Sequence, residues 1–116
     1  MNDPAASRER SLEIETAEQD GTYIVRLRGE LDMGSCDEVD EALREAEQTS
    51  ATRIVLDVDS LSFIDSSGLQ VILRAKRRSD NSGRRLRITR GNGHVADMFR
   101  LTALDMTLDF TESPNG

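Results

Sequence analysis

The apolar residues of this chain change their spacing several times, between every second residue and every third or fourth, and this alternation restricts the possible folds more than any other feature. Residues 12–16 and 22–29 alternate apolar and polar side chains, as half-buried strands do. Asp20 and Gly21, which lie between them, form a turn signal. The two segments are therefore expected to pair as a hairpin.

The rest of the chain alternates helical with strand-like segments. The helices are expected over residues 36–48, 67–81 and 92–102, and the strands over residues 53–61, 85–91 and 106–110. Ser35 is placed to cap the first helix. The run RIVLDVDSL at residues 53–61 is typical of a strand that is buried on both faces.

These elements predict one α/β domain of order β-β-α-β-α-β-α-β. Strands separated by helices imply parallel strands joined by right-handed crossovers, and the leading hairpin adds an antiparallel edge. The result is a mixed, mostly parallel sheet with helices packed on it, spanning residues 12–111. Residues 1–11 are expected to be a disordered N-terminal segment, and residues 112–116 a flexible tail.

Composition indicates where such a domain works. No apolar run approaches the roughly 20 residues that a membrane span needs, and the polar N-terminus lacks the apolar stretch of a signal peptide. The single cysteine, Cys36, excludes an intramolecular disulfide and suits a reducing compartment. We therefore expect a cytoplasmic protein with no membrane partner.

Charge is spread unevenly along the chain. The net charge is −7, yet residues 74–100 hold nine basic residues against two acidic ones. The basic side chains of residues 74–90 are Arg74, Lys76, Arg77, Arg78, Arg84, Arg85, Arg87 and Arg90. They could form a solvated helix end, a surface for an acidic partner or a weak nucleic-acid contact. The acidic total and the few aromatic residues available for base stacking argue against direct nucleic-acid binding.

Functional groups in open α/β sheets collect in loops at the carboxyl ends of the strands. Three loops qualify here, at residues 29–35, 59–68 and 89–94. The middle loop ends in DSSG at the predicted start of a helix, where free N–H groups and the positive end of the helix dipole suit an anion. Gly68 leaves room for the close approach of another backbone. Taken alone, these four residues are also what plain helix capping favours.

Other chemistries are less favoured by the residues present. Ser66 as a nucleophile would need a base, and the only histidine, His94, lies in a different loop, where it is expected to cap the next helix. The chain contains no phosphate-binding motif of the P-loop type. The loop carboxylates Asp57, Asp59 and Asp65 are expected to be solvated rather than metal-bound. The sequence therefore predicts no enzyme, no bound cofactor and no metal.

Three motifs resemble the STAS family, and specifically its stand-alone members, the anti-sigma factor antagonists. The most specific is FIDSSGLQVIL at residues 63–73, which follows the apolar strand IVLDVDSL. The supporting motifs are GELD at residues 29–32 and VADMFRLTAL at residues 95–104. The resemblance covers residues 12–111.

The resemblance implies a partner switch centred on Ser66. In that family the first serine of DSSG is phosphorylated by an anti-sigma factor that is also a serine kinase, so the ATP and magnesium belong to the partner. The unphosphorylated antagonist binds the anti-sigma factor and releases a sigma factor, and a serine phosphatase resets the phosphorylated form. Position by position, Asp32, Asp65, Ser66, Ser67 and Gly68 are expected to contact the partner, with Ser67 also holding the start of the helix.

Two alternatives remain open at this point. STAS domains also serve as accessory or scaffold subunits of transport and stress-signalling complexes, in which case this chain would bind such a complex. The second alternative is a weak nucleic-acid-binding module that acts through the arginine-rich segment at residues 74–90.

Overall fold

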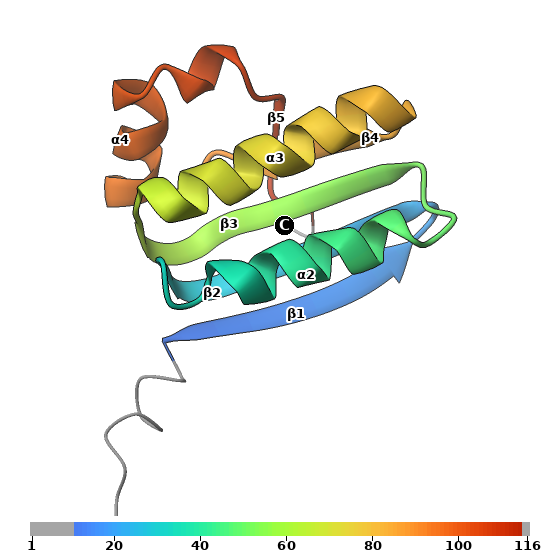
Figure 1. Ribbon diagram of the computed structural model, residues 1–116, viewed down its shortest axis with the longest axis horizontal. Helices are drawn as coiled ribbons and strands as arrows, with labels where there is room; N and C mark the ends of the chain where they lie inside the picture. The colour runs from blue at the N-terminus through green and yellow to red at the C-terminus, as the bar shows by residue number, and fades with distance from the viewer. Residues whose placement is uncertain (1–10, 115–116) are drawn as a thin grey trace, which may run out of the picture.

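The structure, a computed structural model, describes residues 11–114 and confirms the predicted α/β architecture and the order of its elements (Figure 1). The elements are β1 (Leu12–Gln19), β2 (Thr22–Leu31), α2 (Cys36–Glu47), β3 (Arg53–Ile64), α3 (Ser66–Ser82), β4 (Arg85–Thr89), α4 (Gly93–Leu101), the short 3-10 helix η1 (Leu104–Met106) and β5 (Phe110–Thr111). The predicted disordered segment 1–11 and flexible tail 112–116 lie outside the described residues, apart from Ser11 and residues 112–114. None of the helices in the described part is long and apolar enough to span a membrane.

The sheet has five strands in the order β1-β2-β3-β4-β5. β1 and β2 form the predicted antiparallel hairpin, and the other neighbouring pairs are parallel. Asp20 and Gly21 at the hairpin turn both have positive φ, of 53° and 81°, as a tight two-residue hairpin loop requires. Helices α2 and α3 lie side by side on one face of the sheet, and α4 packs at the end of β3 (Figure 1).

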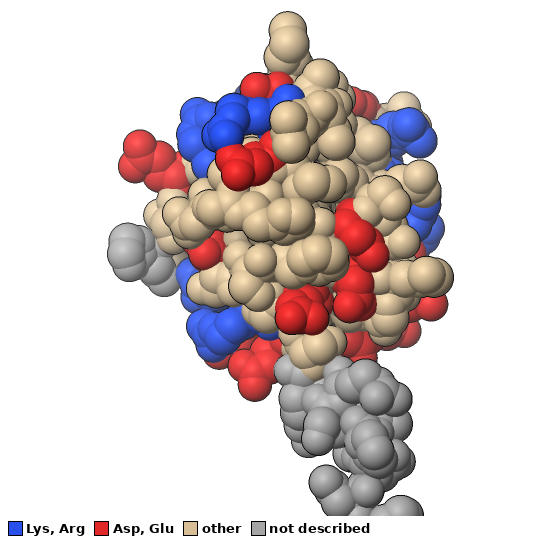
Figure 2. Space-filling model, turned by 90° about the vertical axis from the view of Figure 1, so that its left-hand side faces the viewer, with Lys and Arg blue, Asp and Glu red and all other residues tan. Residues whose placement is uncertain are grey.

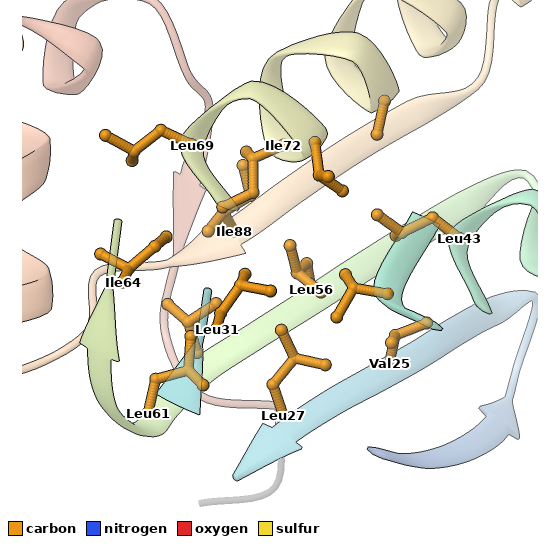
Figure 3. Packing of buried hydrophobic residues seen from close by; sticks show 14 of the residues in the cluster. Val25, Leu27, Leu31, Leu43, Leu56, Leu61, Ile64, Leu69, Ile72 and Ile88 are labelled. Atoms are coloured by element: carbon orange, nitrogen blue, oxygen red, sulfur yellow. The ribbon is translucent and has the colours of Figure 1, made fainter. Parts of the chain in front are cut away.

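The core lies between the sheet and helices α2 and α3. Strand residues such as Leu27 and Leu56 meet helix residues such as Leu43 and Ile72, and all four are fully buried (Figure 3). Burying a side chain of this size contributes roughly 1.5–3 kcal/mol, so this layer contributes strongly to the stability of the fold.

β3 is longer than the sequence pattern predicts, and this extension positions the candidate site. It pairs with β4 only as far as Leu56, opposite Ile88, but it stays paired with β2 up to Ile64, opposite Leu31. Residues 62–64, which follow the predicted strand and were expected in the loop, are therefore strand. β3 consequently projects beyond β4, together with the end of β2.

The final strand is shorter and later than expected. Residues 104–106 form η1 rather than the start of a strand, because Leu104 and Leu108 are both buried at the helical spacing of four residues and Leu108 N donates to Leu104 O at 2.9 Å. Only Phe110 and Thr111 pair with β4. The prediction of a strand over residues 106–110 was wrong in this respect.

Candidate docking site at the start of helix α3

Asp65 organises the point at which β3 passes into α3. Its backbone N donates to Leu31 O at 3.2 Å, which continues the pairing of β2 with β3 by one residue. Its carboxylate accepts two hydrogen bonds, from Gly68 N to Oδ1 at 3.1 Å and from Met33 N to Oδ2 at 3.3 Å. The first bond caps helix α3. The second ties the loop after β2 to the start of that helix.

The two serines of the motif are both left free by this arrangement. Ser66 is exposed and Ser67 is half-buried, and among the described residues neither hydroxyl has a hydrogen-bond partner. The expectation that Ser67 holds the helix start was wrong, because Asp65 supplies the cap. An exposed hydroxyl without an internal partner is open to an enzyme from outside, and Ser66 meets this condition.

Gly68 serves packing inside the domain. It is buried, and a Cβ atom at this position would lie 2.7 Å from Leu31 Cγ and 2.9 Å from Ile64 Cγ1. The close atoms belong to the side chains of Leu31 and Ile64, so the prediction that another backbone approaches here was wrong. The contact of Gly68 with a partner stays a prediction.

Asp32 orders the loop that lies beside Ser66. Its Oδ1 accepts from Gly34 N at 3.0 Å, and its carbonyl accepts from Cys36 N at 2.9 Å. Ser35 occupies the N-cap position of α2 as predicted, but its hydroxyl donates to Glu30 O at 3.0 Å instead of capping the helix. The loop is thus held by its own hydrogen bonds, and the bond from Met33 N to Asp65 ties it to the start of α3.

Two exposed apolar side chains lie on the segments that meet at Asp65, and sequence reasoning missed both. Met33 is 75% exposed and follows Asp32 directly, while Phe63 is 38% exposed and precedes Asp65 by two residues. The side chain of His94 stacks on Phe63 with ring centroids 5.0 Å apart and an angle of 1° between the rings. The only sequence signal for this apolar surface was the FID run at residues 63–65. It was not read as one, because a phenylalanine beside a polar loop is ordinarily buried.

His94 joins α4 to this surface. Its Nε2 lies 3.0 Å from Ile64 O, so the ring bonds to the strand end that precedes Asp65. The N-cap of α4 is Asn92, so the prediction that His94 caps this helix was wrong. Asp59 strengthens the same junction, because its Oδ1 accepts from Gly91 N at 3.0 Å.

The surface around Ser66 combines exposed apolar side chains with acidic ones. Figure 2 shows this end of the molecule, where residues without charge fill the middle, acidic side chains lie beside them and basic side chains lie farther toward the left edge. Asp57, by contrast, is 4% exposed and pairs with Arg26 at 3.0 Å, so it does not belong to this surface. Among residues 11–114, no group of three or more His, Cys, Asp or Glu side chains is placed to hold a metal ion. The arrangement suits docking of another protein.

Comparisons with known proteins agree with this geometry. The model of the STAS domain family matches residues 13–114. The chain is similar to an anti-sigma F factor antagonist of Paenibacillus polymyxa, with 35% identity over 81% of each chain. It is also similar to an anti-sigma-B factor antagonist of Staphylococcus aureus, with 29% identity over 81% of this chain and 87% of the relative. The crystal structure of an anti-sigma factor antagonist from Mycobacterium paratuberculosis superposes with a TM-score of 0.80 at 21% identity, covering 89% of this chain and 87% of the other.

Proposed function

Because the chain belongs to the STAS domain family, we propose that it is an anti-sigma factor antagonist that binds its partner through the surface around Ser66. In this proposal the unphosphorylated chain captures an anti-sigma factor and thereby frees a sigma factor in the cytoplasm. The anti-sigma factor phosphorylates Ser66 with its own ATP and magnesium, and a serine phosphatase removes the phosphate. The chain itself is a regulator and performs no catalysis.

The observation that carries the proposal is the exposure of Ser66 at the first position of a capped helix, with no hydrogen-bond partner for its hydroxyl among residues 11–114. A phosphoryl group adds about −1.5 to −2 charges at neutral pH. The N-terminus of α3 stabilises such an anion by about 0.3–1 kcal/mol when it is exposed. The domain therefore tolerates the modification without a change of fold.

The same phosphate is costly in a docked complex. Met33 and Phe63 present exposed apolar side chains on the two segments that meet at Asp65, and a partner that covers them together with Ser66 removes water from the serine. A phosphate buried there, beside Asp32 and Asp65, would lose its hydration and face like charges, which costs several kcal/mol. Since each 1.4 kcal/mol is about a tenfold change in affinity, phosphorylation should release the partner.

The adjacent serines give a matched test of the acceptor. The co-encoded anti-sigma factor and ATP are incubated with the unmodified chain, Ser66→Ala and Ser67→Ala, and mass spectrometry locates the phosphate. We expect Ser67→Ala to be phosphorylated and Ser66→Ala to stay unmodified while still binding the partner. Phosphate on Ser67 in the Ser66→Ala variant at the normal rate would contradict the assignment.

A binding experiment with variants of Ser66 separates the switch from a scaffold role. A STAS subunit that only holds a complex together would bind its partner equally well as Ser66→Ala and as Ser66→Asp. The switch predicts at least tenfold weaker binding of Ser66→Asp, measured by titration calorimetry. Equal affinities would favour the scaffold.

A further inference from the structure

β1 is the outer strand of the sheet, and one of its edges is open. It pairs with β2 along its whole length, and within residues 11–114 no strand lies on its other side (Figure 1). Every residue of β1 except Leu12 is exposed or half-buried. An unpaired strand edge of this kind is a template on which another chain can pair.

The main-chain groups that point to the open side belong to the even-numbered residues of β1. Ser11 O accepts a hydrogen bond from Glu30 N at 2.7 Å, and in an antiparallel pair successive residues alternate between facing the partner strand and facing away. The two-residue turn after Gln19 gives the same assignment, because the residue before such a turn bonds across it. The N–H and C=O groups of Thr16 and Glu18 therefore point away from β2, and both residues are exposed.

A hollow of about 370 Å³ lies between this edge and α2. Leu12, Ile14 and Thr16 form its β1 side, and they face the helices because Leu12 belongs to the core. Ala42 contributes from α2. Ile14 is half-buried, so it leaves apolar surface on which the stem of a long side chain can pack.

Three glutamates of α2, which we call the acidic stripe, line the same hollow: Glu38, Glu41 and Glu45. Their spacing of three and four residues places them on one face of the helix, and all three are exposed. In the described part of the chain, none of them has a basic group within 4 Å of its carboxylate. The acidic stripe therefore leaves three negative charges available to a partner that lies along β1.

A second copy of this chain fits the edge poorly. Two β1 strands paired with each other would bring together Glu13, Glu15 and Glu18 of both copies. Arg28 is already shared by Glu13 and Glu15, at 4.0 and 3.6 Å, so it offsets only part of this charge. Like charges on neighbouring strands destabilise their pairing. A basic strand meets the opposite charge at the same positions, and this complementarity favours it as the occupant.

We propose that β1 binds an extended, basic segment of a protein partner as an added strand. Alternate side chains of such a strand point to the same face, so lysines or arginines at every second position lie beside α2. Their stems pack on Ile14 and their charged groups reach the acidic stripe. Main-chain bonds to Thr16 and Glu18 supply affinity, and the glutamates supply selectivity. β2 separates β1 from the strand that leads to Ser66, and the proposal does not depend on the antagonist function.

A peptide titration of the full chain tests the proposal. The probes are an eight-residue peptide that alternates Lys and Thr and a control that alternates Gln and Thr, followed by amide shifts in ¹H–¹⁵N spectra. We expect the lysine peptide to shift the amides of residues 13–18 and the glutamine peptide to bind at least tenfold more weakly. Charged residues on a strand edge can also serve only to prevent pairing. In that case neither peptide shifts these amides, which would overturn the proposal, as would shifts that follow the concentration of the chain alone and so indicate a second copy.

Matched charge reversals separate this site from general attraction to an acidic protein. Glu41→Lys with Glu45→Lys is expected to weaken binding of the lysine peptide at least tenfold. Asp105→Lys with Asp109→Lys changes the charge equally at exposed positions outside β1 and α2, and it should alter the affinity less than twofold. Equal weakening by both pairs would overturn the proposal.

Thr16→Pro tests the main-chain contribution, because it removes an outward N–H and changes no charge. Proline is tolerated at such a position of an edge strand, and Thr16→Val is the control that keeps the N–H. We expect Thr16→Pro to weaken binding of the lysine peptide at least tenfold and Thr16→Val less than twofold. Equal affinities of the two variants would show that the peptide binds by charge alone, and would overturn the added strand.

Discussion

Asp65 is one side chain that serves two purposes, since its two oxygens cap α3 and hold the Met33 backbone. Asp65→Ala removes both bonds and should lower the free energy of unfolding by about 1 kcal/mol, the usual cost of losing an N-cap. Asp65→Asn keeps one oxygen for Gly68 N and should lose less than half of that. Urea denaturation measures the free energy of unfolding of the two variants. Equal losses of that free energy would show that the helix cap is not the main contribution of Asp65 to stability.

Met33 belongs to the same surface but stabilises nothing inside the domain, because three quarters of its side chain is exposed. Met33→Ser should therefore leave the free energy of unfolding within about 0.5 kcal/mol. It should weaken binding of the anti-sigma factor by about tenfold, since truncated apolar anchors at an interface often cost more than 1 kcal/mol. Met106→Ser is the matched control, because Met106 is 87% exposed on η1, outside this surface. Equal affinities of the two variants would exclude Met33 from the interface.

At the level of elements, α2 and α3 are joined by a cluster of ion pairs. Arg78 of α3 donates to both carboxylate oxygens of Glu47, at 2.8 and 3.0 Å, and its Nη2 lies 3.5 Å from Asp40 Oδ1. The hydrogen bond from Arg78 to Glu47 raises the pKa of the guanidinium. A raised pKa means that the stabilisation is fully present below the ordinary pKa of arginine, and hence throughout the neutral range.

This cluster of ion pairs predicts that the two arginines that pair with Asp40 contribute unequally to the free energy of unfolding. Arg78→Ala should cost roughly 1–3 kcal/mol of unfolding free energy, because charged hydrogen bonds are lost at a site where Arg78 is only 23% exposed. Arg44→Ala should cost at most about 0.5 kcal/mol, since Arg44 is 57% exposed in its pair with Asp40. Thermal and urea denaturation measure the unfolding free energy that each variant loses. Similar losses would show that burial of the ion pair does not determine its contribution to stability.

For the whole molecule, the spacing of apolar residues was enough to predict the order of elements, the hairpin and the domain type. It could not predict how far β3 extends, because residues 62–64 have the composition of a loop and become strand through pairing with β2. The same extension exposes Phe63 and brings His94 to the site, neither of which local patterns encode. The motif predicts Ser66 as the acceptor, which stays a prediction, but it did not predict that Asp65 caps α3, since Asp and Ser are almost equally good caps and only geometry decides between them.

The switch is expected to act on binding and to leave the fold unchanged. Ser66 lies outside the core, and the N-terminus of α3 favours a negative charge, whereas Asp65 lies close enough to oppose it. These effects nearly cancel, so Ser66→Asp and the phosphorylated chain should unfold within about 1 kcal/mol of the unmodified protein. Partner affinity should fall at least tenfold in both. Calorimetry measures the partner affinity and denaturation measures the free energy of unfolding on the same samples. If the affinity falls together with a comparable fall in the free energy of unfolding, phosphorylation disrupts the domain, and the surface is not a rigid docking site.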